Sequence, residues 1–148
     1  MLVGCMDDAT GDVEWLRVIG SSGDDEATDV AVSGLALVLG GSIKGDVAVD
    51  SVTVTHGAGS TVSRCALIGL DLASGDAVWG RAHGSVDASS QCTVHDLAVD
   101  GASGDIWAVG SFVGATLDLD DSNKPASPNS AKMQPFAVRF NGADQTAT

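Results

Sequence analysis

Two clusters of acidic side chains are the residues whose types and spacing come closest to a recognisable chemistry. Asp118, Asp120 and Asp121 place carboxylate oxygens close together, and Asp24 to Glu26 form a second cluster. Calcium binds six to eight hard oxygen ligands, so the first cluster is a candidate Ca²⁺ site. Its spacing differs from that of an EF-hand loop, and a solvated acidic loop is the competing interpretation. The sequence suggests no other cofactor.

Three histidines, His56, His83 and His95, could supply imidazoles for acid–base chemistry. No Gly-x-Ser-x-Gly motif or other positioned nucleophile accompanies them, so the sequence predicts no catalytic residue. We interpret all three as surface or strand-edge side chains. The segment Gly40–Ser42 lacks the Lys-Ser/Thr pair of a phosphate-binding loop, and we expect it to form a bend between strands.

The composition limits the partners that the chain can have. Its 148 residues carry a net charge of −13, which would repel a phosphate backbone, so we expect no nucleic-acid partner. No apolar run of about eighteen residues is present, so we expect no membrane span. The first residues have no basic region before a short apolar stretch, so an export signal would have to lie outside this chain.

The elements that must position these residues are strands. The chain has 19 glycines, three tryptophans, three phenylalanines and no tyrosine, a balance that suits thin, turn-rich β-structure. Short Val- and Ala-rich runs alternate with Gly, Asp and Ser, and no segment has apolar residues at helical spacing, which predicts an all-β chain. We expect strands near Asp29–Ser33, Leu35–Ile43, Arg64–Leu72, Ala77–Ala82, Thr93–Val99, Asp105–Val113 and Phe136–Phe140.

The turns between these strands have a common composition. Thr10–Asp12, Ser74–Asp76 and Ser103–Asp105 each contain a small polar residue, a glycine and an aspartate. A glycine that takes a positive φ at this place allows a tight hairpin between apolar strands. The sequence therefore predicts three similar hairpins.

The chain also repeats itself over a longer distance. The segment that begins at Asp7 recurs 64 positions later at Asp71, with the shared pattern D-x-x-[ST]-G-D-x-x-W-x-R-x-x-G. A second pair, Asp-x-Ala-Val, occurs at Asp29 and Asp96, and a Gly-Ser pair follows each copy. Recurrence in the same order predicts a repeat architecture in which units stack on their neighbours.

The repeat divides the chain into three parts. Residues 1–20 are the end of one unit, 21–84 are one full unit, and 85–148 are most of a further unit. We expect the chain to be a single partial region of a longer protein. Its partners would then be the remaining units of that protein, or other copies of the chain through self-association.

The cysteines have no metal-binding spacing. Cys65 and Cys92 each open a predicted strand, so a disulfide between them is one interpretation and two buried or free thiols are the other. Cys5 would remain unpaired.

The repeated pattern resembles the β-propeller repeats of the SBBP type, found in many large extracellular and cell-surface proteins. It is also similar to the tryptophan-docking motif of pyrroloquinoline-quinone enzymes and their non-enzymatic relatives. The resemblance implies a β-propeller fragment of about two four-stranded antiparallel blades. It also implies that the tryptophans dock between blades and that aspartates and glycines shape the turns. The residues with this structural role are Asp7, Gly11, Trp15, Asp71, Gly75 and Trp79.

The expected function follows from this resemblance and from the missing catalytic motifs. We expect a non-enzymatic scaffold fragment of a secreted or cell-surface protein, which binds a protein or a glycan. The variable stretches Asp46–Ser63 and Ala115–Gln134 are the expected binding surfaces, because propeller ligands bind on loops and around the axis. The first begins, over Asp46–Val54, like a half-buried strand pair, and the second is expected to be an open loop. The alternative is part of a quinoprotein-like or hydrolytic propeller enzyme whose catalytic residues lie elsewhere.

Overall fold

The computed structural model describes residues 1–33, 36–57, 61–85, 87–119, 129 and 131–142, and the all-β prediction is confirmed. Across these residues we find no helix that is long and apolar enough to cross a membrane. The strands are β1 (Leu2–Met6), β2 (Val13–Val18), β3 (Glu26–Ser33), β4 (Ala36–Ile43), β5 (Val47–Val49), β6 (Val52–Val54), β7 (Arg64–Asp71), β8 (Ala77–His83), β9 (Gln91–Val99), β10 (Ile106–Val113) and β11 (Gln134–Phe140).

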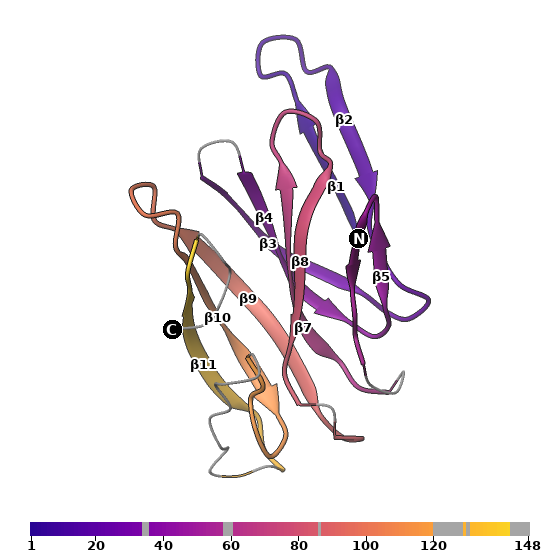
Figure 1. Cartoon of the computed structure of the whole chain (residues 1–148), viewed down its shortest axis with the longest axis vertical. Helices are drawn as coiled ribbons and strands as arrows, with labels where there is room; N and C mark the ends of the chain where they lie inside the picture. The colour runs from indigo at the N-terminus through magenta and orange to yellow at the C-terminus, as the bar shows by residue number, and fades with distance from the viewer. Residues whose placement is uncertain (34–35, 58–60, 86, 120–128, 130, 143–148) are drawn as a thin grey trace.

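The strands form three successive antiparallel sheets and one small hairpin. The central sheet has four strands in the order β3-β4-β7-β8, and β9, β10 and β11 form a three-stranded sheet. β1 pairs with β2, and the β5–β6 hairpin is inserted between β4 and β7. Figure 1 shows β1 and β2 on one side of the central sheet and β9 to β11 on the other. Neighbouring strands of each larger sheet follow chain order, and the long connections are the insertion between β4 and β7 and the segment 114–133 between β10 and β11.

Two apolar clusters lie between the sheets. The first joins β1, β2 and the β5–β6 hairpin to one face of the central sheet, and the second joins the opposite face to the β9–β11 sheet. Because the central sheet is covered on both faces, β4 and β7 are buried along almost their whole length. β10 has a partner sheet on one face, and its residues alternate between buried and more exposed positions.

The expectation of a bend at Gly40–Ser42 is wrong, because all three residues lie within β4. The glycines serve close packing instead. A side chain at Gly41 would collide with the backbone carbonyl of Glu26 on the adjacent strand. A Cβ at Gly40 would lie 2.8 Å from a methyl group of Leu97 in the next sheet. These glycines therefore let neighbouring strands and sheets approach each other.

The stretch Asp46–Val54 forms the strand pair that its alternating pattern predicts. Val47, Val49 and Val54 are buried in the first apolar cluster. A methyl group of Val54 occupies the space that a side chain at Gly80 would need. The hairpin therefore packs directly on β8 and is part of the core.

The three predicted hairpin turns have the same hydrogen-bond pattern. At the first turn, the Asp7 carboxylate accepts the N–H groups of Ala9 and Thr10 at 3.0 and 2.7 Å. Gly11 then takes a φ of 76° and donates its N–H to the Asp7 carbonyl at 2.8 Å. The backbone N–H groups of the turn lower the pKa of the Asp7 carboxyl. Equivalent contacts occur in the turns that begin at Asp71 and Asp100, with positive φ at Gly75 and Gly104.

Candidate functional site: inter-sheet contacts and a polar hollow

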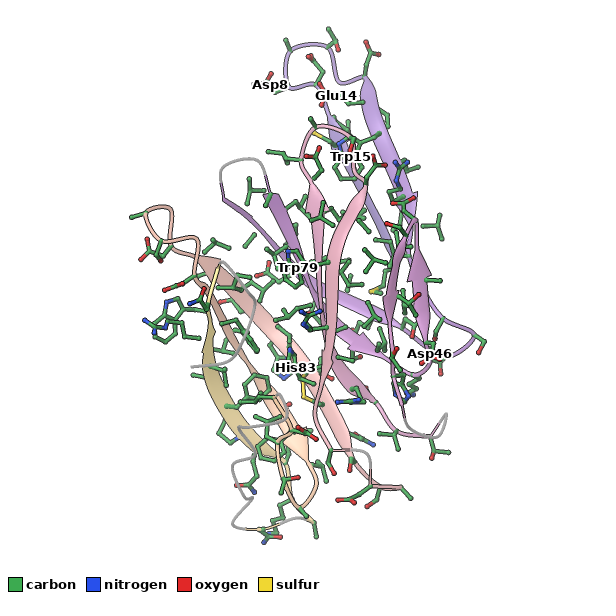
Figure 2. The ribbon with its side chains drawn as sticks, in the orientation of Figure 1. Asp8, Glu14, Trp15, Asp46, Trp79 and His83 are labelled. Carbon is green, nitrogen blue, oxygen red and sulfur yellow. A yellow bond between two sulfur atoms is a disulfide. The ribbon has the colours of Figure 1, made fainter. Side chains whose placement is uncertain are left out.

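Trp15 of β2 packs on the turn between β7 and β8 in the central sheet. Its indole Nε1 donates to the Leu72 carbonyl at 2.9 Å, and only 7% of the residue is exposed. The six-membered ring packs on Gly75, where a Cβ would come within 2.5 Å of it. Figure 2 places Trp15 beside the turn that connects β7 to β8. An indole buries a large apolar area and has one N–H to satisfy, and this turn provides for both.

Arg17, two residues further along β2, binds the same turn. Its guanidinium donates to the Ser74 carbonyl at 3.2 Å and to the Asp76 carboxylate at 2.7 Å. The hydrogen bond from Arg17 lowers the pKa of the Asp76 carboxyl. The Asp71–Asp76 turn therefore receives both the tryptophan and the arginine of the repeated W-x-R sequence.

Trp79, the equivalent of Trp15 in the next copy, packs on the other side of the central sheet. It is partly buried against the second apolar cluster, and its ring fills the space above Gly69 on the paired strand. Figure 2 shows it between β8 and the β9–β11 sheet. Residues 143–148 lie outside the described residues.

The strands β3 and β9 are each the first strand of their sheet in chain order, and polar contacts join them. The Asp29 carboxylate accepts the Leu97 N–H at 2.6 Å, and the Thr28 hydroxyl donates to the Val94 carbonyl at 2.6 Å. Sequence reasoning did not find this role for Asp29. The repeat of Asp-x-Ala-Val at Asp29 and Asp96 was the available signal, since a repeated polar residue within an apolar strand needs a partner.

A disulfide joins Cys65 of β7 to Cys92 of β9. The Cys92 N–H also donates to the Ser63 carbonyl at 2.8 Å, so the bond adds to a backbone contact between the two sheets. Cys5 is a free thiol whose Sγ donates to a Glu14 carboxylate oxygen at 3.1 Å. That hydrogen bond raises the pKa of the Cys5 thiol, which disfavours the reactive thiolate.

The described residues contain one of the three proposed calcium ligands. Asp118 is partly buried and accepts the Gly84 N–H at its backbone carbonyl, at 2.6 Å. Burial lowers the pKa of Arg64, and the negative charge of Asp118 acts in the opposite direction. Asp120 and Asp121 lie outside the described residues. Within the described ranges, no three acidic, histidine or cysteine side chains are grouped to hold a metal ion.

The interpretation of the histidines as surface or strand-edge side chains is wrong for two of them. His56 is 1% exposed, and one ring nitrogen lies 3.0 Å from the Val62 carbonyl. His83 is 5% exposed and its ring lies against Phe140. Both lie in the interior, His56 in the connection that follows β6 and His83 at the end of β8. His95 is exposed, and its Nε2 lies 2.9 Å from the Ser111 hydroxyl.

The variable stretches contribute to the interior as well as to the surface. Leu117 and Leu119, in the described part of the stretch 115–134, are buried in the second apolar cluster. The open loop expected further along this stretch falls mostly on residues 120–128 and 130, outside the described residues.

A polar hollow of about 270 Å³ opens where several strands begin or end. It spans two sheets, since Glu26 and Ser42 belong to the central sheet and Gln91 and Thr93 to β9. The lining residues are Asp24, Asp25, Glu26, Ser42, Lys44, Thr61, Ser63, Gln91 and Thr93.

The Asp25 carboxylate holds one side of the hollow in place. It accepts the Lys44 N–H at 3.0 Å, the Ser21 hydroxyl at 2.9 Å and the Ser21 backbone N–H. Burial acts to raise the pKa of Asp25, but the hydrogen bonds from Ser21 and Lys44 outweigh it and hold the pKa below its ordinary value. Asp25 thus fixes the loop before β3 to the end of β4.

No model of a known protein family matches this chain, and no curated protein matches it in sequence. The geometry of the inter-sheet contacts and of the polar hollow is therefore the basis for a functional proposal.

Proposed function

We propose that this chain is part of a β-propeller of the SBBP type and serves as a non-enzymatic interaction scaffold of a secreted or cell-surface protein. Its ligand would be a protein or a glycan. The observation that carries the proposal is the contact of Trp15 and Arg17 with the Asp71–Asp76 turn. The residues on both sides of this contact belong to one repeated motif, so each unit can present a W-x-R sequence to the next turn and a turn to the previous W-x-R.

The order of the strands supports the same proposal. β3 and β9 are the first strands of two consecutive sheets, and they lie together through Asp29 and Thr28. In a propeller blade the first strand lies nearest the axis, and later strands lie progressively further out. The β5–β6 hairpin packs on β8, the edge strand of the central sheet.

An exposed apolar face on β1 and β2 also fits a stacked repeat. Leu2 is 64% exposed and Leu16 is 53% exposed. Their equivalents 64 positions later, Ala66 and Gly80, are buried under the first apolar cluster and the β5–β6 hairpin. The same face is thus covered in one copy and bare in the other, and another unit of the repeat would cover it.

The disulfide between Cys65 and Cys92 supports an oxidising compartment, such as the cell exterior. The polar hollow supports a binding role, because it offers hydroxyl, amide and carboxylate groups from two sheets on one concave surface. We therefore place the ligand at the hollow.

The proposal is tested by attaching many copies of the chain to beads and probing them with printed arrays of glycans and of extracellular-protein peptides. We expect saturable binding to members of one class, with the bound molecules recovered unchanged. No saturable binding on either array, or chemical conversion of a bound molecule, would contradict the proposal.

A further inference from the structure

The position of the hollow brings acceptor groups of two sheets together. Glu26 and Ser42 are directly paired across β3 and β4, so their side chains leave the sheet on the same face. Val38 and Gly40, on the same face of β4, pack against the β9–β11 sheet, so this face is directed at β9. The side chains of Glu26 and Ser42 therefore share a space with those of Gln91 and Thr93.

The charges of the hollow leave one carboxylate available. Asp25 is occupied by the hydrogen bonds that fix the loop, and Asp24 lies 3.8 Å from the Lys44 ammonium. Glu26 makes no side-chain hydrogen bond or ion pair with any described residue. The lining has three acidic groups and one basic group, so an anionic ligand would be repelled and a cationic ligand attracted.

Ser42 is a second, independent indication of a ligand. The residue is only 6% exposed, and among the described residues its hydroxyl has no hydrogen-bond partner. Its oxygen is not sealed in the interior but opens onto the hollow. The Ser42 hydroxyl lines the hollow, so a ligand group placed there would satisfy it.

We propose that the hollow binds the guanidinium group of an arginine side chain from a partner protein. A guanidinium is a planar cation with five N–H donors, and acceptors come from two sheets, Glu26 and Ser42 from the central sheet and Gln91 from β9. The volume of about 270 Å³ is below the roughly 300 Å³ at which small-molecule sites begin, and suits a single side chain. No aromatic residue lines the hollow, so a sugar ring would find no surface for stacking.

This inference rests on the proposed scaffold function and names the partner chemistry of its site. The test is a titration of the ¹⁵N-labelled chain with the peptide Gly-Gly-Arg-Gly-Gly, followed by amide chemical shifts. The matched control peptide has citrulline, which is uncharged and nearly the same shape, in place of arginine. We expect saturable shifts confined to the backbone around Glu26, Ser42 and Gln91 with the arginine peptide, and binding at least about tenfold weaker with citrulline.

Two variants separate the site from general attraction to an acidic protein. Glu26→Gln removes the available charge, and Ser42→Ala removes a hydroxyl that has no partner in the fold, so both variants should remain folded. We expect each to weaken arginine-peptide binding by about five- to tenfold or more. Asp8→Asn makes the same change of charge as Glu26→Gln on the exposed β1–β2 turn (Figure 2) and should leave binding unchanged.

Equal weakening by Asp8→Asn, equal binding of the citrulline peptide, or shifts spread over the whole surface would overturn the arginine site. Array binding without peptide shifts at the hollow would contradict this inference and leave the scaffold proposal standing. Peptide shifts at the hollow without any saturable array binding would contradict the scaffold proposal instead.

Discussion

At the scale of single residues, two glycines in equivalent turns differ in what lies above them. Gly11 and Gly75 have φ values of 76° and 74° and make the same turn hydrogen bond. A Cβ on Gly11 would meet no atom within 4 Å, whereas a Cβ on Gly75 would come within 2.5 Å of the Trp15 ring. The pair therefore separates the cost of the turn conformation from the cost of losing tryptophan docking.

We expect Gly11→Ala to lower the free energy of unfolding by about 1–2 kcal/mol, the usual cost of a left-handed conformation for a residue with a Cβ. Gly75→Ala should cost about 1–3 kcal/mol more, because the ring must shift in a packed core. Urea unfolding monitored by far-UV circular dichroism measures both variants. Equal losses would show that Trp15 contributes little to holding the sheets together.

A single carboxylate should also link stability to pH. The folded-state pKa of Asp25 lies below its ordinary value, so in the acid range the unfolded state binds the proton more tightly than the folded state. The stabilisation by Asp25 is therefore complete above the ordinary aspartate pKa of about 4 and is lost as the pH falls through the lower folded-state pKa. Thermal unfolding between pH 2 and 7 should show a shallower acid dependence for Asp25→Asn than for the parent chain. Superimposable pH profiles would rule out this role.

At the scale of secondary-structure elements, only one of the two aspartates of the repeated Asp-x-Ala-Val sequence joins β3 to β9. Asp29 accepts the Leu97 N–H, while its repeat equivalent Asp96 is exposed. We expect Asp29→Ala to cost about 1.5–3 kcal/mol, the range for a hydrogen bond to a charged group. Asp96→Ala should change stability by less than about 0.5 kcal/mol. Similar midpoints for the two variants in urea unfolding would contradict the importance of this contact.

Local patterns predicted the strands from β3 onward, whereas β1 and β2 were not among the expected strands. The alternation in Asp46–Val54 predicted a half-buried hairpin, and β5 and β6 form it. The role of glycines within an apolar run was ambiguous in the sequence, because a glycine can allow either a bend in the chain or the close approach of a neighbouring strand. Gly40 and Gly41 proved to serve close approach, a role that depends on Leu97 and Glu26 in other strands.

At the scale of the whole molecule, the disulfide links two sheets that otherwise meet through packing and a few hydrogen bonds. The cysteines are 27 positions apart, and closing a loop of this length stabilises a fold by about 3–4 kcal/mol in the chain-entropy model. We expect the double variant Cys65→Ala/Cys92→Ala to lose about this amount in urea unfolding. Added reductant should destabilise the parent chain to a similar extent and leave the double variant unchanged. A parent chain insensitive to reductant would contradict the prediction.

The sequence alone determined the all-β class and the turns, because these depend on residues a few positions apart. The aspartate, the serine or threonine, and the glycine of each turn contact one another within six residues, so their spacing is visible in the chain. It also marked Trp15 and Gly75 as members of one motif with tryptophans docked between units, but it did not identify the Leu72 carbonyl and Gly75 as the groups that receive the Trp15 ring.

Tertiary structure alone decided which sheets meet and what lies between them. Trp15 and Leu72 are 57 positions apart, and Asp29 and Leu97 are 68 positions apart, so no local pattern records these contacts. The polar hollow depends on the same long-range arrangement, since Ser42 and Gln91 become neighbours only when two sheets stack. Burial of His56 and His83 was likewise decided by covering segments, because exposure depends on the neighbours that folding supplies and not on the residue type.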